Sequence, residues 1–207
     1  MIIHRDKEIL MGKIFYIMGK SASGKDSIYK DLLAKADLPL ERMVLYTTRP
    51  IRKGETSGNE YHFVDETILQ QLQGAGKVIE SRAYNTIHGV WTYFTIDDGE
   101  LDLANSNYLG IGTLESYQCL VDYYGSKYLY PIYVEVEDGE RLMRSIKREG
   151  KQENPRYEEV CRRFLADSED FSEAKIAKVG IGKRFINHDK ELCQAEIGKY
   201  IKDMLYL

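Results

Sequence analysis

Residues 19–25 are bounded by two glycines and end in a lysine, the residue types and spacing of a phosphate-binding loop. They follow the apolar run 14–18, an expected strand, and precede a helical pattern over 24–36. Glycines let successive backbone N–H groups point at an anion, and the helix start adds its positive dipole end. A plain glycine- and serine-rich connection is the alternative. The predicted ATP-binding residues are Gly19, Lys20, Ser21, Ala22, Ser23, Gly24, Lys25, Asp26 and Ser27.

The residue after the lysine departs from the P-loop pattern, which places Ser or Thr there to reach Mg²⁺. Asp26 occupies that position and Ser27 follows it. Kinases of nucleoside monophosphates often carry the hydroxyl one place later, and by that resemblance Ser27 contacts the metal shell. Asp26 either faces solvent near the positive helix start or approaches the metal, and the sequence leaves both alternatives open.

Composition limits the classes of function. The 207 residues suit one domain with a sizeable core, and a net charge of −4 argues against a general nucleic-acid binder. Cys119, Cys161 and Cys193 lack metal-ligand spacing, which favours reduced thiols and a cytoplasmic protein. No apolar run approaches the roughly 20 residues of a membrane span. Residues 1–10 are too charged for a signal peptide and are expected to be an extension.

Strand and helix signals alternate, which predicts an α/β fold with a parallel sheet flanked by helices. Strands are expected at 14–18, 43–46, 61–64, 77–80, 92–95, 108–112, 131–136 and 184–187. Helices are expected at 24–36, 66–73, 114–124, 138–149, 156–177 and 190–205. The region 45–98 is predicted to form a small β-rich insertion.

Two arginines, Arg49 and Arg52, lie in the polar segment after the second expected strand. An arginine fork suits phosphate oxygens because two parallel N–H groups can meet two oxygens. A basic loop in addition to the P-loop suggests a second phosphate site. The alternative is a solvated charge run, the usual role of surface arginines.

The stretch Thr-Thr-Arg-Pro-Ile-Arg-Lys-Gly-Glu at 47–55, followed by Gly58 and Tyr-His-Phe-Val at 61–64, resembles the guanylate kinase family. The resemblance extends over about 11–205 and implies ATP-dependent phosphorylation of GMP to GDP with Mg²⁺. By position it assigns Arg49, Arg52 and Tyr61 to the phosphate of GMP.

Glu80 matches the family's base-reading carboxylate. Guanine presents two adjacent donors, N1–H and the N2 amino group, and a carboxylate accepts both. Adenine would leave Glu80 unpaired, and an unpaired buried polar group discriminates strongly. With one deletion, His88 takes the place of a family tyrosine that touches the GMP phosphate, and a histidine can donate to a phosphate.

Several positions depart from the family pattern. Val90 replaces a small hydroxyl residue, and Leu45 replaces a serine. The family's Leu-Asp-Ile-Asp strand reads Leu-Gly-Ile-Gly at 109–112, so Gly110 and Gly112 stand where two aspartates help to hold magnesium-bound water and the incoming nucleotide. Glu115 could substitute for them. The change leaves metal handling and base selectivity open.

A lid is expected over the charged helical stretch after the third core strand. Arg144 and Arg148 resemble the family's lid arginines and lie four residues apart, on one helical face. Arg163 matches an arginine that begins the next helix. With Lys25 and Arg49 these three are the predicted catalytic residues, because phosphoryl transfer needs charge neutralisation. Asn187 matches an asparagine beside the family's adenine site.

The resemblance implies a P-loop parallel sheet with a nucleoside-monophosphate-binding insertion and a helical lid, in a single domain over 11–205. The predicted parts are a core at 11–44, 99–137 and 164–205, a GMP-binding insertion at 45–98, a lid at 138–163 and an extension at 1–10. The expected partners are the nucleotides ATP and GMP, without nucleic acid or membrane. Two alternatives remain: a kinase of another acceptor such as ribose bisphosphate, and a non-catalytic binding module.

Overall fold

The core is a parallel sheet in the order β2-β7-β1-β8-β9, seen in a computed structural model that describes residues 12–86 and 89–206. Its strands are β1 (Ile14–Met18), β2 (Leu40–Arg42), β7 (Asn107–Gly112), β8 (Leu129–Glu135) and β9 (Arg184–Ile186). Every residue of β1 is buried, which explains its unbroken apolar sequence at the centre of a sheet covered on both faces. The predicted α/β fold with a parallel sheet is confirmed.

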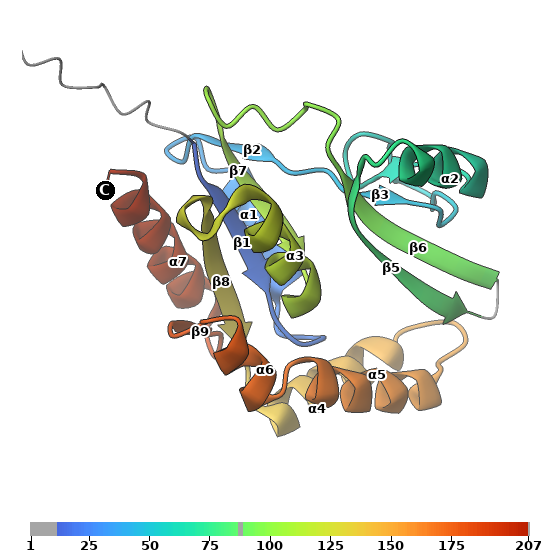
Figure 1. Cartoon of the computed structure of the whole chain (residues 1–207). Coiled ribbons are helices and arrows are strands. Elements are labelled where there is room, and N and C mark those ends of the chain that lie inside the picture. Colours follow the sequence, from blue (N-terminus) through green and yellow to red (C-terminus); the bar gives the residue numbers. More distant parts are fainter. Residues whose placement is uncertain (1–11, 87–88, 207) are drawn as a thin grey trace, which may run out of the picture.

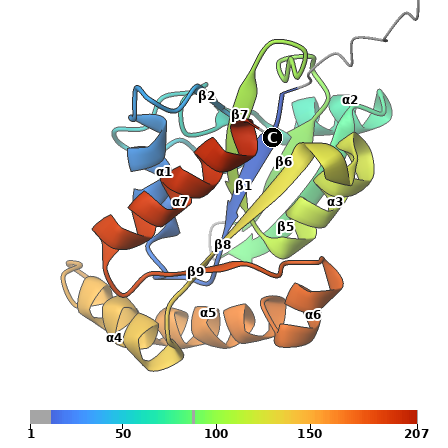
Figure 2. The same cartoon turned by 90° about the vertical axis from the view of Figure 1, so that its left-hand side faces the viewer.

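Helices cover both faces of this sheet (Figures 1 and 2). On one face α1 (Lys25–Leu33) and α7 (Lys190–Leu205) pack against Phe15 and Ile17; on the other α3 (Leu114–Tyr124) packs against Tyr16. Beyond the carboxyl ends of the strands lie α4 (Asp138–Glu149), α5 (Tyr157–Asp170) and α6 (Glu173–Lys178), and the 3₁₀ turn η1 (Ser126–Tyr128) precedes β8. In the described ranges no helix is both long and apolar enough to span a membrane.

A second sheet, in the order β4-β3-β6-β5, lies beside the core (Figure 1). It contains β3 (Tyr46–Thr47), β4 (His62–Phe63), β5 (Val78–Thr86) and β6 (Gly89–Ile96), and α2 (Glu66–Gly74) packs on it through Leu69. The Asp65 carboxylate accepts from the backbone N–H of Ile68 and caps α2. The predicted short strands at 77–80 and 92–95 are parts of the longer β5–β6 hairpin.

Two predicted elements are wrong. Residues 43–45 form no strand, because the chain crosses there from one sheet to the other: Met43 N–H donates to Leu109 in the core, and Tyr46 pairs within the second sheet. The helix expected over 156–177 is two helices, α5 and α6. They are separated at Phe171, whose buried ring packs 5.9 Å from that of Tyr133. Burial of this ring needs a bend that a continuous helix would not provide.

Candidate active site

The loop between β1 and α1 has the geometry of an anion cradle. Gly24 adopts φ +86° and is the N-cap of α1, so the first N–H groups of the helix are unpaired within it. A Cβ on Gly24 would lie 2.4 Å from Asn187 Nδ2, and one on Gly19 would lie 2.4 Å from the Val134 carbonyl oxygen. Both glycines are therefore needed for close packing. The buried Ser23 hydroxyl has no hydrogen-bond partner in the described ranges, which fits an anion site.

The predicted cation and metal positions lie at the start of α1. Lys25 Nζ is 3.4 Å from the exposed Asp26 carboxylate. Ser27 is exposed on the first turn of the helix. Among residues 12–86 and 89–206 no group of three His, Cys, Asp or Glu side chains could enclose a metal. The Ser27 hydroxyl and the Asp26 carboxylate offer oxygen ligands of the kind that Mg²⁺ takes, and their contact with the metal stays a prediction.

Asn187, the residue directly after β9, packs against the loop and is hydrogen-bonded to it. Its Nδ2 donates to the Ser23 carbonyl oxygen at 2.7 Å, and its backbone N–H donates to Glu135 at 2.8 Å. The side chain is buried, and one of its two amide N–H groups is used by the loop. The role beside adenine stays a prediction, and the observed contact gives Asn187 a part in shaping the cradle.

A buried ionic cluster, which the sequence did not predict, joins the loop to α4 and α5. Arg141 is 1% exposed, donates to Asp138 at 2.6 Å and to Asp167 at 3.3 Å, and stacks 3.9 Å from the Phe164 ring. Asp167 also accepts from the backbone N–H of Ser21 at 2.8 Å. Its only sequence signal was the i, i+3 spacing of Asp138 and Arg141. The cluster holds both lid helices against the phosphate loop.

Lys20 completes this cluster from the loop side, since its Nζ lies 3.1 Å from Asp138. The loop is thus joined to α4 by the Lys20 side chain and to α5 by the backbone N–H of Ser21. Of these charges Arg141 is the buried one, so removal of Asp167 would leave the Arg141 guanidinium without a buried partner, which is costly. The loop and the lid helices are expected to move together.

The predicted lid arginines gather near the loop. Arg148 and Arg163 line a small cavity with Ser21 and Arg141. Arg163 donates to Glu159 at 2.7 Å. Arg144 has a different position: it donates to Glu140 at 2.5 Å and to the Asn187 carbonyl oxygen at 2.9 Å. Two of the three arginines therefore lie where a terminal phosphate could meet them, and the third braces the loop after β9.

The predicted phosphate fork of the second site is paired with an internal carboxylate. Arg49 is 3% exposed and donates through both terminal nitrogens to Glu55 at 2.9 Å, with the Tyr61 and Phe63 rings 5.5 and 5.2 Å away. The hydrogen bond from Arg49 holds the pKa of Glu55 below its ordinary value. Arg52 is exposed and gives only its backbone N–H to Glu55. Glu55 thus links Arg49 to the backbone of Arg52, and Arg49 lies beside the Tyr61 ring; their role at a GMP phosphate stays a prediction.

Glu80 lies on β5 with its carboxylate almost fully buried. Arg82, two residues along the same face, donates its Nε to Glu80 Oε2 at 2.9 Å and its Nη2 to Oε1 at 3.4 Å. Thr95 on β6 donates its hydroxyl to Oε1 at 2.8 Å. Arg82 was not predicted, although the strand alternation would have placed it beside Glu80. His88 lies outside the described residues.

The two glycines of β7 have a structural explanation. A Cβ on Gly110 would lie 2.6 Å from the Tyr16 ring, and one on Gly112 would lie 2.1 Å from the Tyr16 hydroxyl. The Tyr16 side chain of β1 therefore occupies the space that larger residues at these positions would need, and its hydroxyl lies 2.9 Å from Ser116 Oγ. Burial raises the pKa of Tyr16 well above its usual range, so the phenol is neutral.

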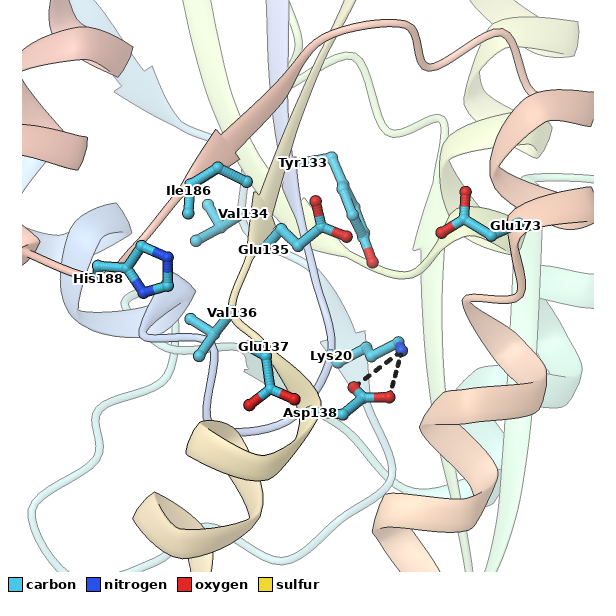
Figure 3. A pocket seen from close by; sticks show the side chains of 10 residues that line it. All are labelled: Lys20, Tyr133, Val134, Glu135, Val136, Glu137, Asp138, Glu173, Ile186 and His188. Atoms are coloured by element: carbon cyan, nitrogen blue, oxygen red, sulfur yellow. Dashed lines mark hydrogen bonds and ion pairs between the residues drawn. The ribbon is translucent and has the colours of Figure 1, made fainter.

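A cavity of about 340 Å³ lies beside the loop at the carboxyl end of β8 (Figure 3). Four carboxylates line it, facing Lys20 and His188: Glu135, Glu137, Asp138 and Glu173. Such a lining repels a triphosphate, so the cradle and the lid arginines, rather than this cavity, mark the candidate site. Lys20 points across the cavity mouth toward Asp138, as Figure 3 shows.

A parallel sheet flanked by helices makes this an α/β protein, and the glycine-bounded loop at the carboxyl edge of the sheet is its candidate phosphate-binding site. Residues 11–92 match the guanylate kinase family model. The chain is therefore similar to the guanylate kinase family in the sequence of residues 11–92, and it shares its fold with a solved guanylate kinase structure.

Curated relatives and a solved structure show the same similarity. The chain is 40% identical over 72 residues to the guanylate kinase of Nitrosococcus oceani, and 36% identical over 86 residues to that of Mycobacterium tuberculosis. These segments span 34% and 41% of this chain and 34% and 39% of the relatives, so about a third to two fifths of each is matched. The guanylate kinase structure from Anaplasma phagocytophilum covers 94% of this chain and 86% of its own, with a TM-score of 0.65 and 16% identity.

Proposed function

We propose that the protein is a nucleoside monophosphate kinase that transfers the γ-phosphoryl group of ATP to GMP and forms GDP and ADP. Residues 19–27 bind the phosphates of ATP, with Mg²⁺ supplied on the nucleotide. GMP binds over the second sheet, with its phosphate near Arg49, Arg52 and Tyr61. The observation that carries the proposal is the pairing of the anion cradle with a carboxylate, Glu80, that suits guanine.

The residues of this chain would act by position and charge. The GMP phosphate is a competent nucleophile near neutral pH, so no general base is required. Lys25 neutralises charge on the β- and γ-phosphates, and Arg148 and Arg163 approach the transferred group from the lid. Release of Arg163 from Glu159 and of Arg49 from Glu55 would make both forks available to phosphate oxygens. Bound Mg²⁺ would supply further charge neutralisation.

An ADP-release assay with five acceptors tests the proposal: GMP, AMP, UMP, dTMP and ribose bisphosphate. We expect turnover with GMP and little with the other four. Turnover with ribose bisphosphate alone would instead support the alternative acceptor. ATP binding without turnover on any acceptor would support a non-catalytic module.

Lys25→Ala tests the catalytic centre. We expect kcat to fall roughly hundredfold or more, because a preorganised cation opposite the transferred charge is lost. Lys30→Ala, an exposed lysine later in the same helix, is the control and should keep the wild-type kcat. If Lys25→Ala retained most of its turnover, the P-loop mechanism would be wrong.

A further inference from the structure

The Glu80 carboxylate is already bound by a guanidinium group. Its side chain is 3% exposed, and that of Arg82 is 10% exposed. The third nitrogen of Arg82, Nη1, donates to Thr113 Oγ1 at 3.2 Å, at the N-cap of α3 and directly after β7. Arg82 therefore places the carboxylate against the carboxyl edge of the core sheet, the edge from which the phosphate loop also emerges.

The donor pattern of Arg82 matches that of a guanine base. In guanine, N1–H and the N2 amino group are joined by a single carbon, which makes an N–C–N unit with two parallel donors. Arg82 presents Nε and Nη2 to Glu80 from the same unit. Each oxygen of the carboxylate receives one of these donors, which is the arrangement expected for guanine.

The acceptor capacity of Glu80 cannot satisfy both partners. A carboxylate has about four acceptor positions. Arg82 takes one on each oxygen and Thr95 takes another on Oε1, which leaves one on Oε2. Guanine needs one on each oxygen, so Arg82 must withdraw when guanine binds in this way.

We propose that Arg82 is an internal competitor for the purine-reading carboxylate, one that holds Glu80 in the nucleotide-free protein and is displaced by the edge of guanine. The inference rests on the proposed GMP-binding function. Adenine has an acceptor at N1 and lacks the N2 amino group, so AMP leaves the Arg82–Glu80 pair in place. Arg82 thereby lowers the affinity of the protein for GMP. Its displacement from Glu80 requires both N–H donors of the guanine base.

The charges agree with this role. Burial alone would lower the pKa of Arg82, but the adjacent Glu80 carboxylate outweighs it and raises the pKa above the usual range. Arg82 therefore keeps its charge and its fork. Removal of Arg82 would leave Glu80 buried with one partner, Thr95, and a guanine edge would then restore the missing pair. Both effects favour GMP binding by the variant.

Calorimetric titration of GMP into the wild type, Arg82→Gln and Arg82→Lys tests the proposal. If Glu80 is available in about one wild-type molecule in ten, the Kd for GMP should fall roughly tenfold in Arg82→Gln. Arg82→Lys, whose ammonium cannot form the fork, should show a smaller decrease. ATP affinity should stay unchanged in both, and Arg42→Ala, an arginine of β2, is the control. Unchanged or weaker GMP binding by Arg82→Gln would overturn the proposal and identify Arg82 as a positioning residue.

A spectroscopic measurement covers the case in which Arg82→Gln does not fold. In the wild type, the Arg82 Nε–H resonance should be protected from solvent exchange, should lose that protection with GMP and should keep it with AMP. An unaltered resonance at saturating GMP would contradict displacement. The proposed function is tested separately. A wild-type protein that neither binds nor phosphorylates GMP would contradict the kinase proposal. In that case the competitor role of Arg82 would stand only if Arg82→Gln gained GMP binding.

Discussion

At the residue scale, the packing of β1 against β7 depends on a matched set of three residues: Tyr16, Gly110 and Gly112. The tyrosine ring of β1 fills the space beside β7, so this strand cannot carry side chains at the two glycine positions. Carboxylate side chains at these two positions would therefore clash with the Tyr16 side chain on the neighbouring strand. The sequence alone revealed the glycines, but it could not reveal that Tyr16 lies opposite them, because the contact joins residues about a hundred positions apart.

Gly112→Ala tests this coupling. A methyl group 2.1 Å from the Tyr16 hydroxyl should destabilise the fold by about 1–3 kcal/mol through overpacking. The same substitution combined with Tyr16→Phe should cost less, because the clashing oxygen is absent. Urea unfolding of the two single variants and the double variant gives the coupling.

Gly74→Ala is the control, since nothing lies within 4 Å of a Cβ there. It should be neutral or slightly stabilising at the end of α2. Equal costs for Gly112→Ala with and without the tyrosine hydroxyl would contradict the matched set.

At the element scale, Asp167 is the link between the loop and the lid helix α5. Asp167→Asn keeps the shape of the side chain but removes its negative charge. That charge pairs with Arg141 and strengthens the hydrogen bond donated by the Ser21 N–H. We expect a loss of about 1–3 kcal/mol in unfolding free energy and a higher Kd for ATP. Urea unfolding and ATP titration measure the two effects.

Asp170→Asn, in the same helix and without an ion pair among the described residues, is the control for helix propensity and charge. A destabilised Asp167→Asn protein with wild-type ATP affinity would show that the cluster supports the fold without shaping the cradle.

Glu159 gives α5 a pH dependence. Hydrogen bonds from Arg162 and Arg163 lower its pKa from 4.5 to about 2. Because the folded-state pKa is lowered, its stabilising contribution is present above pH 4.5 and is lost as the pH falls through about 2. We expect wild-type Tm to fall more steeply than that of Glu159→Gln over this window, with a small difference because the pair is exposed and screened.

Thermal melts between pH 2 and 6 measure this effect. Glu158→Gln is the matched control, since no ion pair of Glu158 occurs in the described ranges. If Glu158→Gln and Glu159→Gln flattened the pH profile equally, the arginine pairs would not be its cause.

Elements with strong local signals were predictable, and those decided by long-range packing were not. Four elements have the predicted bounds: helices α3, α4 and α7 and strand β1. Each has a local apolar pattern that is bounded by a capping or helix-breaking residue. The strand at 43–46 failed because its apolar residues cross between two sheets. The site followed the same division. The phosphate-binding loop was predicted from its spacing, whereas the contacts of Arg82 with Thr113 and of Asp167 with Arg141 and Ser21 join residues far apart in the sequence.

At the scale of the whole molecule, the second sheet carries the single tryptophan of the chain, Trp91 on β6. It lies opposite Tyr84 in the β5–β6 hairpin, far in sequence from residues 19–27. We expect GMP to change its fluorescence emission and ATP alone to leave it nearly unchanged. Fluorescence titration with each nucleotide measures this, and Trp91→Phe should abolish the signal. An equal response to ATP alone would contradict separate sites for the two nucleotides.

The contact between Asn187 and Ser23 also constrains the order of events during synthesis. The loop at 19–25 leaves the ribosome early, yet the amide that supports it belongs to a residue 164 positions later. Its sheet neighbours β7 and β8 also emerge late. A nascent chain should therefore complete the phosphate-binding loop only after residue 187 has been translated.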